Sequence, residues 1–226
     1  MFRHQRLVRL TIAAGTAVVA WVGIRRWQTR WGATLNEVTR RLPGDDVVVA
    51  PQYSATNAIT VDAAPRAVWP WLVQMGAYGR AGWYAIDRFD NAGVPSAREI
   101  VPELQDLRVG DVMATDRSGE GFLVEAIDPA RSLVLCIRST EAVTSAALVL
   151  EPTVDGRTRL VLRLRLRAGT TLRGLGYRAL MEVGHVIMTR RMLFGIKARV
   201  ESLVAREAHA LEREELPVPQ AGRVRG

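Results

Sequence analysis

Short apolar runs separated by turn residues occupy the middle of the chain. The runs lie at residues 110–115, 121–127, 132–138, 145–152 and 157–167, and the segments between them include DRSGEG, DPAR and TVDG. Runs of this length at this spacing are typical of strands joined by tight turns. The pattern therefore predicts an antiparallel meander.

The last run, RTRLVLRLRLR (157–167), has the sharpest alternation of apolar and polar residues. Leucines at positions 160, 162, 164 and 166 share one face, and arginines at 159, 163, 165 and 167 share the other. Successive side chains of a strand point to opposite faces, so we expect the leucines to pack on a core. The arginine face is expected to meet water, with anionic lipid headgroups as the alternative.

From residue 175 to residue 215 the apolar positions follow a helical period instead. Six of them fall roughly on one stripe, namely Met181, Met188, Met192, Ile196, Val200 and Leu203. This pattern predicts a long amphipathic helix. Before the meander, residues 57–61 predict a strand, and residues 62–76 predict a helix with Pro70 inside it. The order predicts an α+β fold of the helix-grip kind, a curved antiparallel sheet wrapped around a long C-terminal helix.

An apolar run without charges, residues 10–24, precedes this pattern and lies between two groups of arginines. As a helix it would measure about 22 Å, which is shorter than the roughly 30 Å of a bilayer core, although flanking residues could extend it. We interpret it as an N-terminal apolar helix that forms a single-pass membrane anchor. A signal peptide and a soluble or interfacial helix remain alternatives. Arg40 and Arg41 favour a cytoplasmic location for the domain that follows.

The chain is accordingly divided into three parts. Residues 1–44 are the predicted membrane anchor and linker, residues 45–215 the predicted ligand-binding domain, and residues 216–226 a tail without periodicity that we expect to be disordered. A chain of 226 residues has the length of one domain with additions.

The net charge of +8 raises the possibility of a nucleic-acid partner, but its distribution argues against one. Residues 1–41 contain eight arginines and one acidic residue, so most of the excess belongs to the N-terminal arm. One cysteine and three scattered histidines provide neither a disulfide nor a zinc site. The glycines of GRAGWY (79–84) and RGLGYR (173–178) do not follow a strand as a nucleotide-binding loop requires. We expect no cofactor and no metal.

The leucine face of the sheet and the methionine stripe of the helix should enclose an apolar space, and such a space is a usual place for a hydrophobic ligand. The alternative is a filled core, in which the methionines and aromatic residues only pack together. We predict that the ligand-binding residues are Trp69, Trp83, Tyr84, Met181, His185, Met188 and Met192.

Three residues are candidates for acid or base chemistry. Asp87 and Asp90 are three positions apart, so their carboxylates would share one face of a helix, and His185 lies on the buried stripe. The alternative is that the two aspartates cap turns or pair with arginines and that His185 is a satisfied core residue. No nucleophile matched to these residues is evident, so no catalytic residue is assigned.

Several segments resemble a known family. AAPRAVWPWLVQMG (63–76), GRAGWYAIDRFDN (79–91), VPELQDLRVGDVM (101–113) and HVIMTRRMLFGIKARVE (185–201) are similar to the SRPBCC superfamily, the START-like helix-grip proteins, and within it to a bacterial polyketide cyclase-like branch. The resemblance covers about residues 55–205. It implies the helix-grip fold, but the superfamily includes lipid and sterol carriers, hormone receptors, cyclases and ring-hydroxylase subunits, so it implies little about activity.

Three functions are compatible with these features. We favour a membrane-tethered binding or carrier domain whose partner is a hydrophobic small molecule or lipid. The second is an enzyme of the polyketide cyclase or dehydrase kind, using Asp87, Asp90, Tyr84 or His185 as acid and base. The third is a membrane-anchored regulatory or interaction protein whose pocket has no ligand.

Overall fold

The computed structural model describes residues 22–214. Residues 22–28 are helical. The helices and strands that follow are, in chain order, α2 (Leu35–Thr39), β1 (Tyr53–Val61), α3 (Pro65–Val73), α4 (Asp87–Asp90), the 3₁₀ helix η1 (Pro102–Leu104), β2 (Val112–Ala114), β3 (Gly121–Asp128), β4 (Ser132–Arg138), β5 (Ala142–Pro152), β6 (Thr158–Ala168) and α5 (Leu172–Glu214).

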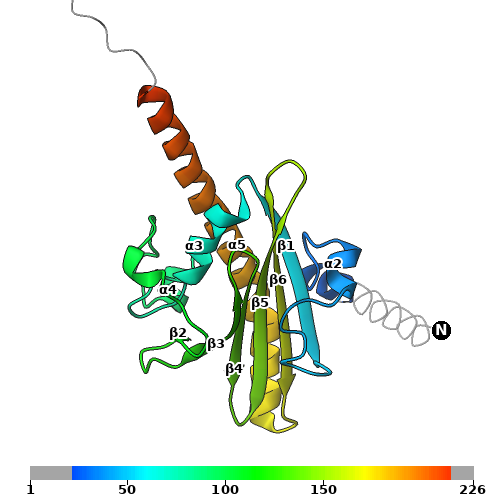
Figure 1. Cartoon of the computed structure of the whole chain (residues 1–226). Helices are drawn as coiled ribbons and strands as arrows, with labels where there is room; N and C mark the ends of the chain where they lie inside the picture. Colours follow the sequence, from blue (N-terminus) through cyan, green and yellow to red (C-terminus); the bar gives the residue numbers. More distant parts are fainter. Residues whose placement is uncertain (1–21, 215–226) are drawn as a thin grey trace, which may run out of the picture.

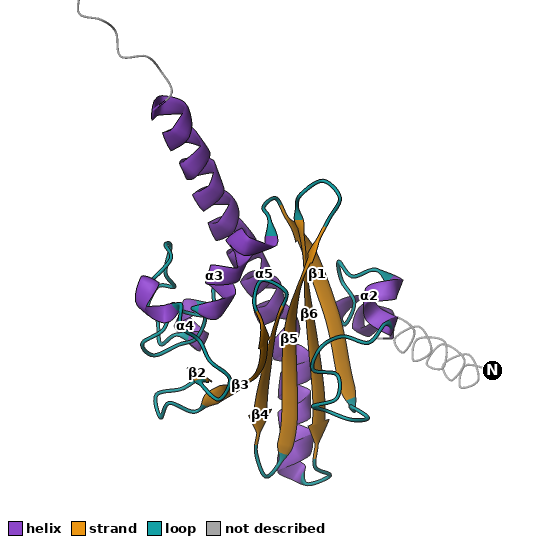
Figure 2. Cartoon of the chain, in the orientation of Figure 1, coloured by secondary structure: helices purple, strands orange, loops and turns teal. Residues whose placement is uncertain are grey.

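The six strands form one antiparallel sheet in the order β1-β6-β5-β4-β3-β2. Strands β2 to β6 follow one another as neighbours, which confirms the predicted meander, and β1 pairs with β6 along its whole length. The sheet curves, and α5 crosses one of its faces (Figures 1 and 2). The predicted α+β architecture, with a curved sheet and a long C-terminal helix, is therefore confirmed.

The core lies where the sequence pattern placed it, between the leucine face of β6 and one side of α5. Leu160 and Leu162 on β6 pack in the same buried cluster as Leu193, Ile196 and Val200 on α5. Trp71 and Leu72 of α3 close one end of this cluster and are fully buried. The alternation in β6 and the helical period in α5 thus describe the two sides of one core.

The arginine face of β6 differs from the prediction that it meets water or lipid. Residues 37–45 cover much of it, and Arg163 is only 5% exposed. The Arg163 guanidinium donates to Asp45 Oδ2 at 2.7 Å, to the Arg40 carbonyl at 2.8 Å and to Thr56 Oγ1 at 3.0 Å. Arg159 pairs with Glu37 at 2.7 Å. These arginines hold the N-terminal segment on the sheet, because its carboxylates and carbonyls meet their charge.

The prediction of a membrane location is not supported by the structure. Within residues 22–214, no helix is long and apolar enough to cross a bilayer. The helical residues 22–28 include Arg25, which donates to Glu182 of α5 at 3.1 Å. The other part of the predicted apolar helix, residues 10–21, and the predicted disordered tail, residues 216–226, lie outside the described residues.

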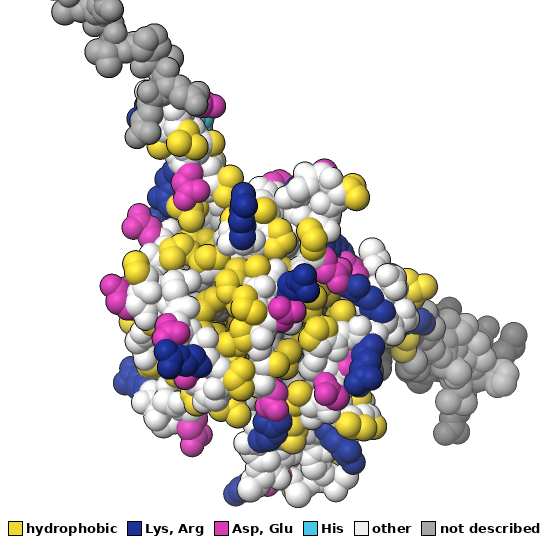
Figure 3. All heavy atoms as spheres, viewed as in Figure 1, with side chains coloured by type: hydrophobic (Ala, Val, Ile, Leu, Met, Phe, Trp, Pro, Cys, Tyr) yellow, Lys and Arg dark blue, Asp and Glu magenta, His cyan; other side chains and the backbone are white. Residues whose placement is uncertain are grey.

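The face of the molecule drawn in Figure 3 carries charged side chains of both signs. Lys and Arg side chains are interspersed with Asp and Glu around a central group of hydrophobic side chains. This face offers no continuous basic surface of the kind that contacts nucleic-acid phosphates. The absence of a nucleic-acid partner stays a prediction.

Candidate functional site

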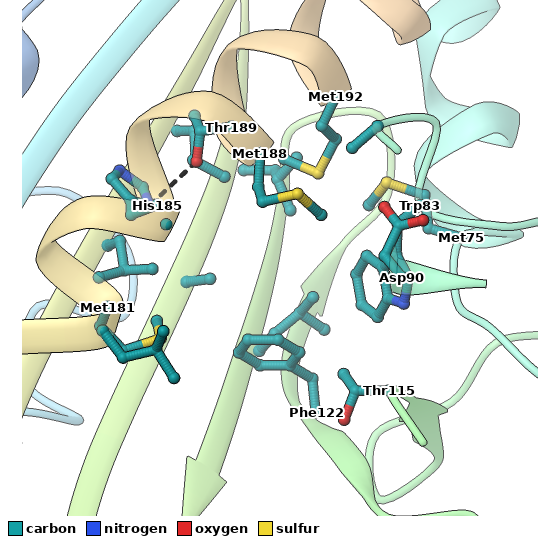
Figure 4. Close-up of a pocket in the computed structure, with 18 residues that line it drawn as sticks. Met75, Trp83, Asp90, Thr115, Phe122, Met181, His185, Met188, Thr189 and Met192 are labelled. Atoms are coloured by element: carbon teal, nitrogen blue, oxygen red, sulfur yellow. Dashed lines mark hydrogen bonds between the residues drawn. The ribbon is translucent and has the colours of Figure 1, made fainter. Parts of the chain in front are cut away.

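A cavity of about 300 Å³ lies between the sheet and α5 (Figure 4). This volume is at the lower end of the range of ligand pockets, roughly 300–1,000 Å³. The sheet contributes Phe122, Leu135, Ala146, Leu148, Leu162 and Leu164, α5 contributes Leu180, Met181, Gly184, His185, Met188, Thr189 and Met192, and the remaining wall consists of Met75, Trp83, Ala85, Asp90 and Thr115.

The α5 wall of the cavity follows from helix geometry. Met181, His185, Met188 and Met192 are spaced three or four residues apart, so they project from one side of the helix. Met188 and Met192 extend toward Trp83 and Asp90 on the opposite wall (Figure 4). The structure thus brings these predicted residues together around one space, and the binding role of that space stays a proposal.

The end wall is built from the stretch between α3 and β2 and from residues that follow β2. Trp83 donates its indole N–H to the Ala114 carbonyl at 3.2 Å, and its ring packs edge-on against Phe122 with 5.7 Å between centroids. Met75 and Thr115 complete this side. The sequence pattern did not select Met75, Thr115 or Phe122, because each comes from a segment whose position against α5 depends on the loop connections.

Two of the predicted ligand-binding residues lie outside the cavity wall. Trp69 belongs to α3, packs on the core and does not line the cavity. Tyr84 is 3% exposed, and its hydroxyl accepts from Gln74 Nε2 at 2.9 Å and donates to the Trp71 carbonyl at 3.2 Å. Burial raises the pKa of Tyr84. This tyrosine anchors the stretch between α3 and β2, which is a structural role.

The structure separates the two candidate aspartates. Asp87 lies outside the cavity wall and accepts hydrogen bonds from the backbone N–H of Ser96, at 3.0 Å, and from its hydroxyl. Asp90 lines the cavity, and its Oδ2 accepts from the Ile86 N–H at 3.1 Å. Burial raises the pKa of Asp90, and Asp87 adds a smaller repulsive contribution. The two carboxylates therefore have different roles and do not form a shared pair.

His185 lines the cavity, but both of its ring nitrogens are engaged. Asn57 donates through Nδ2 to the Gln28 carbonyl at 3.2 Å, so its Oδ1 is the acceptor for His185 Nε2–H, also at 3.2 Å. His185 Nδ1 then accepts from the Thr189 hydroxyl at 2.9 Å. This arrangement satisfies a neutral imidazole and leaves no free lone pair for a general base. His185 is thus placed as a satisfied buried residue.

The burial of His185 should make the protein less stable in acid. Burial lowers the pKa of His185 from 6.5 to about 4, so the unfolded chain binds this proton more readily than the folded one. The free energy of unfolding should therefore be unaffected by this group above pH 6.5 and should fall by on the order of 3 kcal/mol as the pH falls toward 4. Urea unfolding of the wild type and of His185→Gln across this range should show the difference as a pH-dependent gap.

His209 provides the matched control for that measurement. It lies on the exposed end of α5, where its ring is 3.4 Å from Glu212. His209→Gln measures what the loss of an exposed histidine does, and His185→Gln should differ from it in its pH-dependent gap. If His185→Gln has the same slope of unfolding free energy against pH as the wild type, other groups cause that slope.

Metal-binding clusters are absent from residues 22–214. No group of three or more His, Cys, Asp or Glu side chains in that range could hold a metal ion. Cys136 is buried, and burial raises the pKa of its thiol. The described site therefore consists of an apolar cavity, one acidic side chain and hydrogen-bonded neutral polar groups.

Comparison with known proteins finds only distant likeness. No family model matches the chain, and no curated protein matches it. A protein from Nitrosomonas europaea is 14% identical, with 70% of this chain and 99% of that chain covered and a TM-score of 0.45. The self-sacrificing resistance protein CalC of Micromonospora echinospora is 13% identical, with coverages of 66% and 94% and a TM-score of 0.41. These likenesses assign no activity to the chain.

Proposed function

We propose that the chain is a binding or carrier protein that holds one hydrophobic small molecule between its sheet and α5. The observation that carries this proposal is the cavity of about 300 Å³, whose lining is almost wholly apolar. Filling such a space with an apolar molecule removes apolar surface from water and recovers contacts that the empty walls lack. We further propose that the chain belongs among the START-like helix-grip proteins, on the basis of its motifs and of the curved sheet around α5.

Binding accounts for the site better than acid/base catalysis does. A cyclase or dehydrase needs a base with a free lone pair near its substrate. His185 has both ring nitrogens in hydrogen bonds, and Asp87 is bonded to Ser96 away from the cavity. Asp90 is the one acidic side chain that residues 22–214 contribute to the lining, and although one of its oxygens has no partner there, no second acid or base of the lining is free to act with it. We therefore do not assign a reaction to the cavity.

A direct test is titration with N-phenyl-1-naphthylamine, an uncharged fluorophore that becomes bright in apolar surroundings. We expect saturable binding of one molecule per chain. At a free concentration of 100 times the dissociation constant, the ligand should add about 2.7 kcal/mol to the free energy of unfolding. Fluorescence titration and thermal unfolding measure the two effects. A fluorescence signal that does not saturate, with no change in melting temperature, would refute the proposal.

A further inference from the structure

Asp90 is the unusual polar group of the cavity, because half of its carboxylate is unused. Oδ2 accepts from the Ile86 N–H, whereas Oδ1 is buried and has no hydrogen-bond partner among residues 22–214. Figure 4 shows the carboxylate among Trp83, Met75 and Met192. A buried acceptor without a donor costs free energy, about 1–3 kcal/mol for a neutral group and more for a charged one. A ligand that supplies the donor would remove this cost.

The other polar side chains of the lining already use their polar hydrogen atoms in hydrogen bonds within the protein. The Thr115 hydroxyl donates to the Glu120 carbonyl at 3.2 Å, and the Thr189 hydroxyl donates to His185. His185 directs its own N–H at Asn57. The part of the cavity wall that residues 22–214 form therefore has no free side-chain donor for a carboxylate ligand, and its unused polar atom is an acceptor.

The charges around Asp90 also favour a ligand that supplies a donor over one that carries a carboxylate. No ion pair joins Asp90 to a lysine, arginine or histidine within residues 22–214. Arg80, in the same stretch of chain, directs its guanidinium at the carbonyls of Met75 and Val73. His185 is neutral because burial lowers its pKa. An anionic ligand would thus meet a like charge without a compensating cation, whereas a cationic ligand would meet its counter-ion.

We propose that the molecule bound in this cavity carries a hydrogen-bond donor, and most favourably a protonated amine, that contacts Asp90 Oδ1. This inference rests on the proposed binding function, and it restricts the ligand class to an apolar body with one cationic or neutral donor group. Fatty acids and other apolar carboxylates are excluded as preferred ligands. The raised pKa of Asp90 agrees with an acid that lacks its partner.

Four naphthalene compounds of similar size test the ligand class: 1-naphthylmethylamine, 1-naphthalenemethanol, 1-methylnaphthalene and 1-naphthoate. They share the apolar ring and differ in the attached group. At pH 7 we expect the wild type to bind the amine about 10-fold more tightly than 1-methylnaphthalene, since a hydrogen bond to a charged group contributes about 1.5–3 kcal/mol. The alcohol should lie between them, and 1-naphthoate should bind most weakly. Isothermal titration calorimetry measures all four, and this order needs no variant.

Asp90→Asn then tests whether Asp90 causes the preference for the amine. This nearly isosteric change removes the charge, so the amine should lose its advantage of about 10-fold while 1-methylnaphthalene binds as before. Asp106→Asn is the control for net charge, because Asp106 is an exposed residue paired with Arg108. Thermal unfolding checks that each variant is folded.

The outcomes separate this inference from the proposed function. If none of the four compounds binds the wild type, the binding function itself fails. If all bind without preference for the amine, or 1-naphthoate binds best, the cavity binds ligands but the inference is overturned. An amine preference that persists in Asp90→Asn would also overturn it, because the donor would then contact another group.

Discussion

Gly184→Leu is expected to abolish ligand binding while raising the melting temperature. Gly184 lines the cavity on the same side of α5 as Met181 and Met188, and a Cβ at this position would meet no atom of residues 22–214 within 4 Å. A leucine side chain should therefore enter the empty space. Glycine inside a helix costs about 1 kcal/mol relative to residues such as alanine or leucine, so the variant should melt about 2–4 °C higher.

Titration with N-phenyl-1-naphthylamine and thermal unfolding measure the two effects of Gly184→Leu. Gly176→Leu is the matched control, because Gly176 lies in the same helix, is exposed, and also has open space around its Cβ. It should gain helix stability and keep full binding. A Gly184→Leu protein that binds the fluorophore like the wild type would show that the ligand lies elsewhere.

Replacement of Arg163 by alanine should cause the largest loss of stability, about 3–5 kcal/mol. The Arg163 side chain is only 6% exposed and bridges β6 to β1 and to residues 37–45 of the N-terminal segment. Its removal would take one of two arginine partners from Asp45, which keeps Arg165, and would leave the carbonyls that Arg163 contacts without this donor in a buried place. Chemical denaturation monitored by circular dichroism measures the loss of free energy of unfolding.

Arg167 provides the comparison on the same strand face. It is exposed near the end of β6, so Arg167→Ala should change the free energy of unfolding by no more than about 0.5 kcal/mol. Equal losses in the two variants would mean that loss of any arginine from this basic chain matters more than the buried network. A loss below about 1 kcal/mol in Arg163→Ala would show that the segment is held by other contacts.

The main elements of the fold could be predicted because they repeat a local period. The leucines of β6 alternate with period two over the whole strand, and the apolar residues of α5 recur at three and four positions. Each pattern requires a large apolar partner, and the two patterns are each other's partners in the core. The meander follows from short runs and turns, since neighbouring strands of a hairpin pair with each other.

What covers the arginine face of β6 could not be predicted from such a period. Alternation indicates which residues leave the core, but it does not say what lies on the other side of the sheet. Glu37 and Asp45 are the partners of Arg159 and Arg163, more than a hundred residues away along the chain. A pairing at that separation has no local signature. The interpretation as a solvent or lipid surface was therefore wrong for Arg159 and Arg163, whereas Arg167 at the end of the strand is exposed.

Part of the candidate site could likewise be predicted from local spacing, and part could not. The stripe containing Met181, His185, Met188 and Met192 could be assigned to one helix face from its spacing, and all four residues line the cavity. The roles of Asp87 and Asp90 could not be separated, because three residues of spacing predict a shared face. In the structure, α4 is a single short turn, and Ser96 returns to bind Asp87 while Asp90 faces the cavity.

The sequence by itself determined the α+β class, the meander, the long C-terminal helix and the apolar character of the space between them, because each rests on a periodic pattern of burial. Only the tertiary structure decided that residues 37–45 cover the arginine face, that Tyr84 supports the wall from outside, that His185 is satisfied, and that Asp90, in the cavity wall, has a buried oxygen without a partner among residues 22–214. These features depend on contacts between distant segments, and the physical reason is that hydrogen-bond satisfaction is set by where chains meet in space.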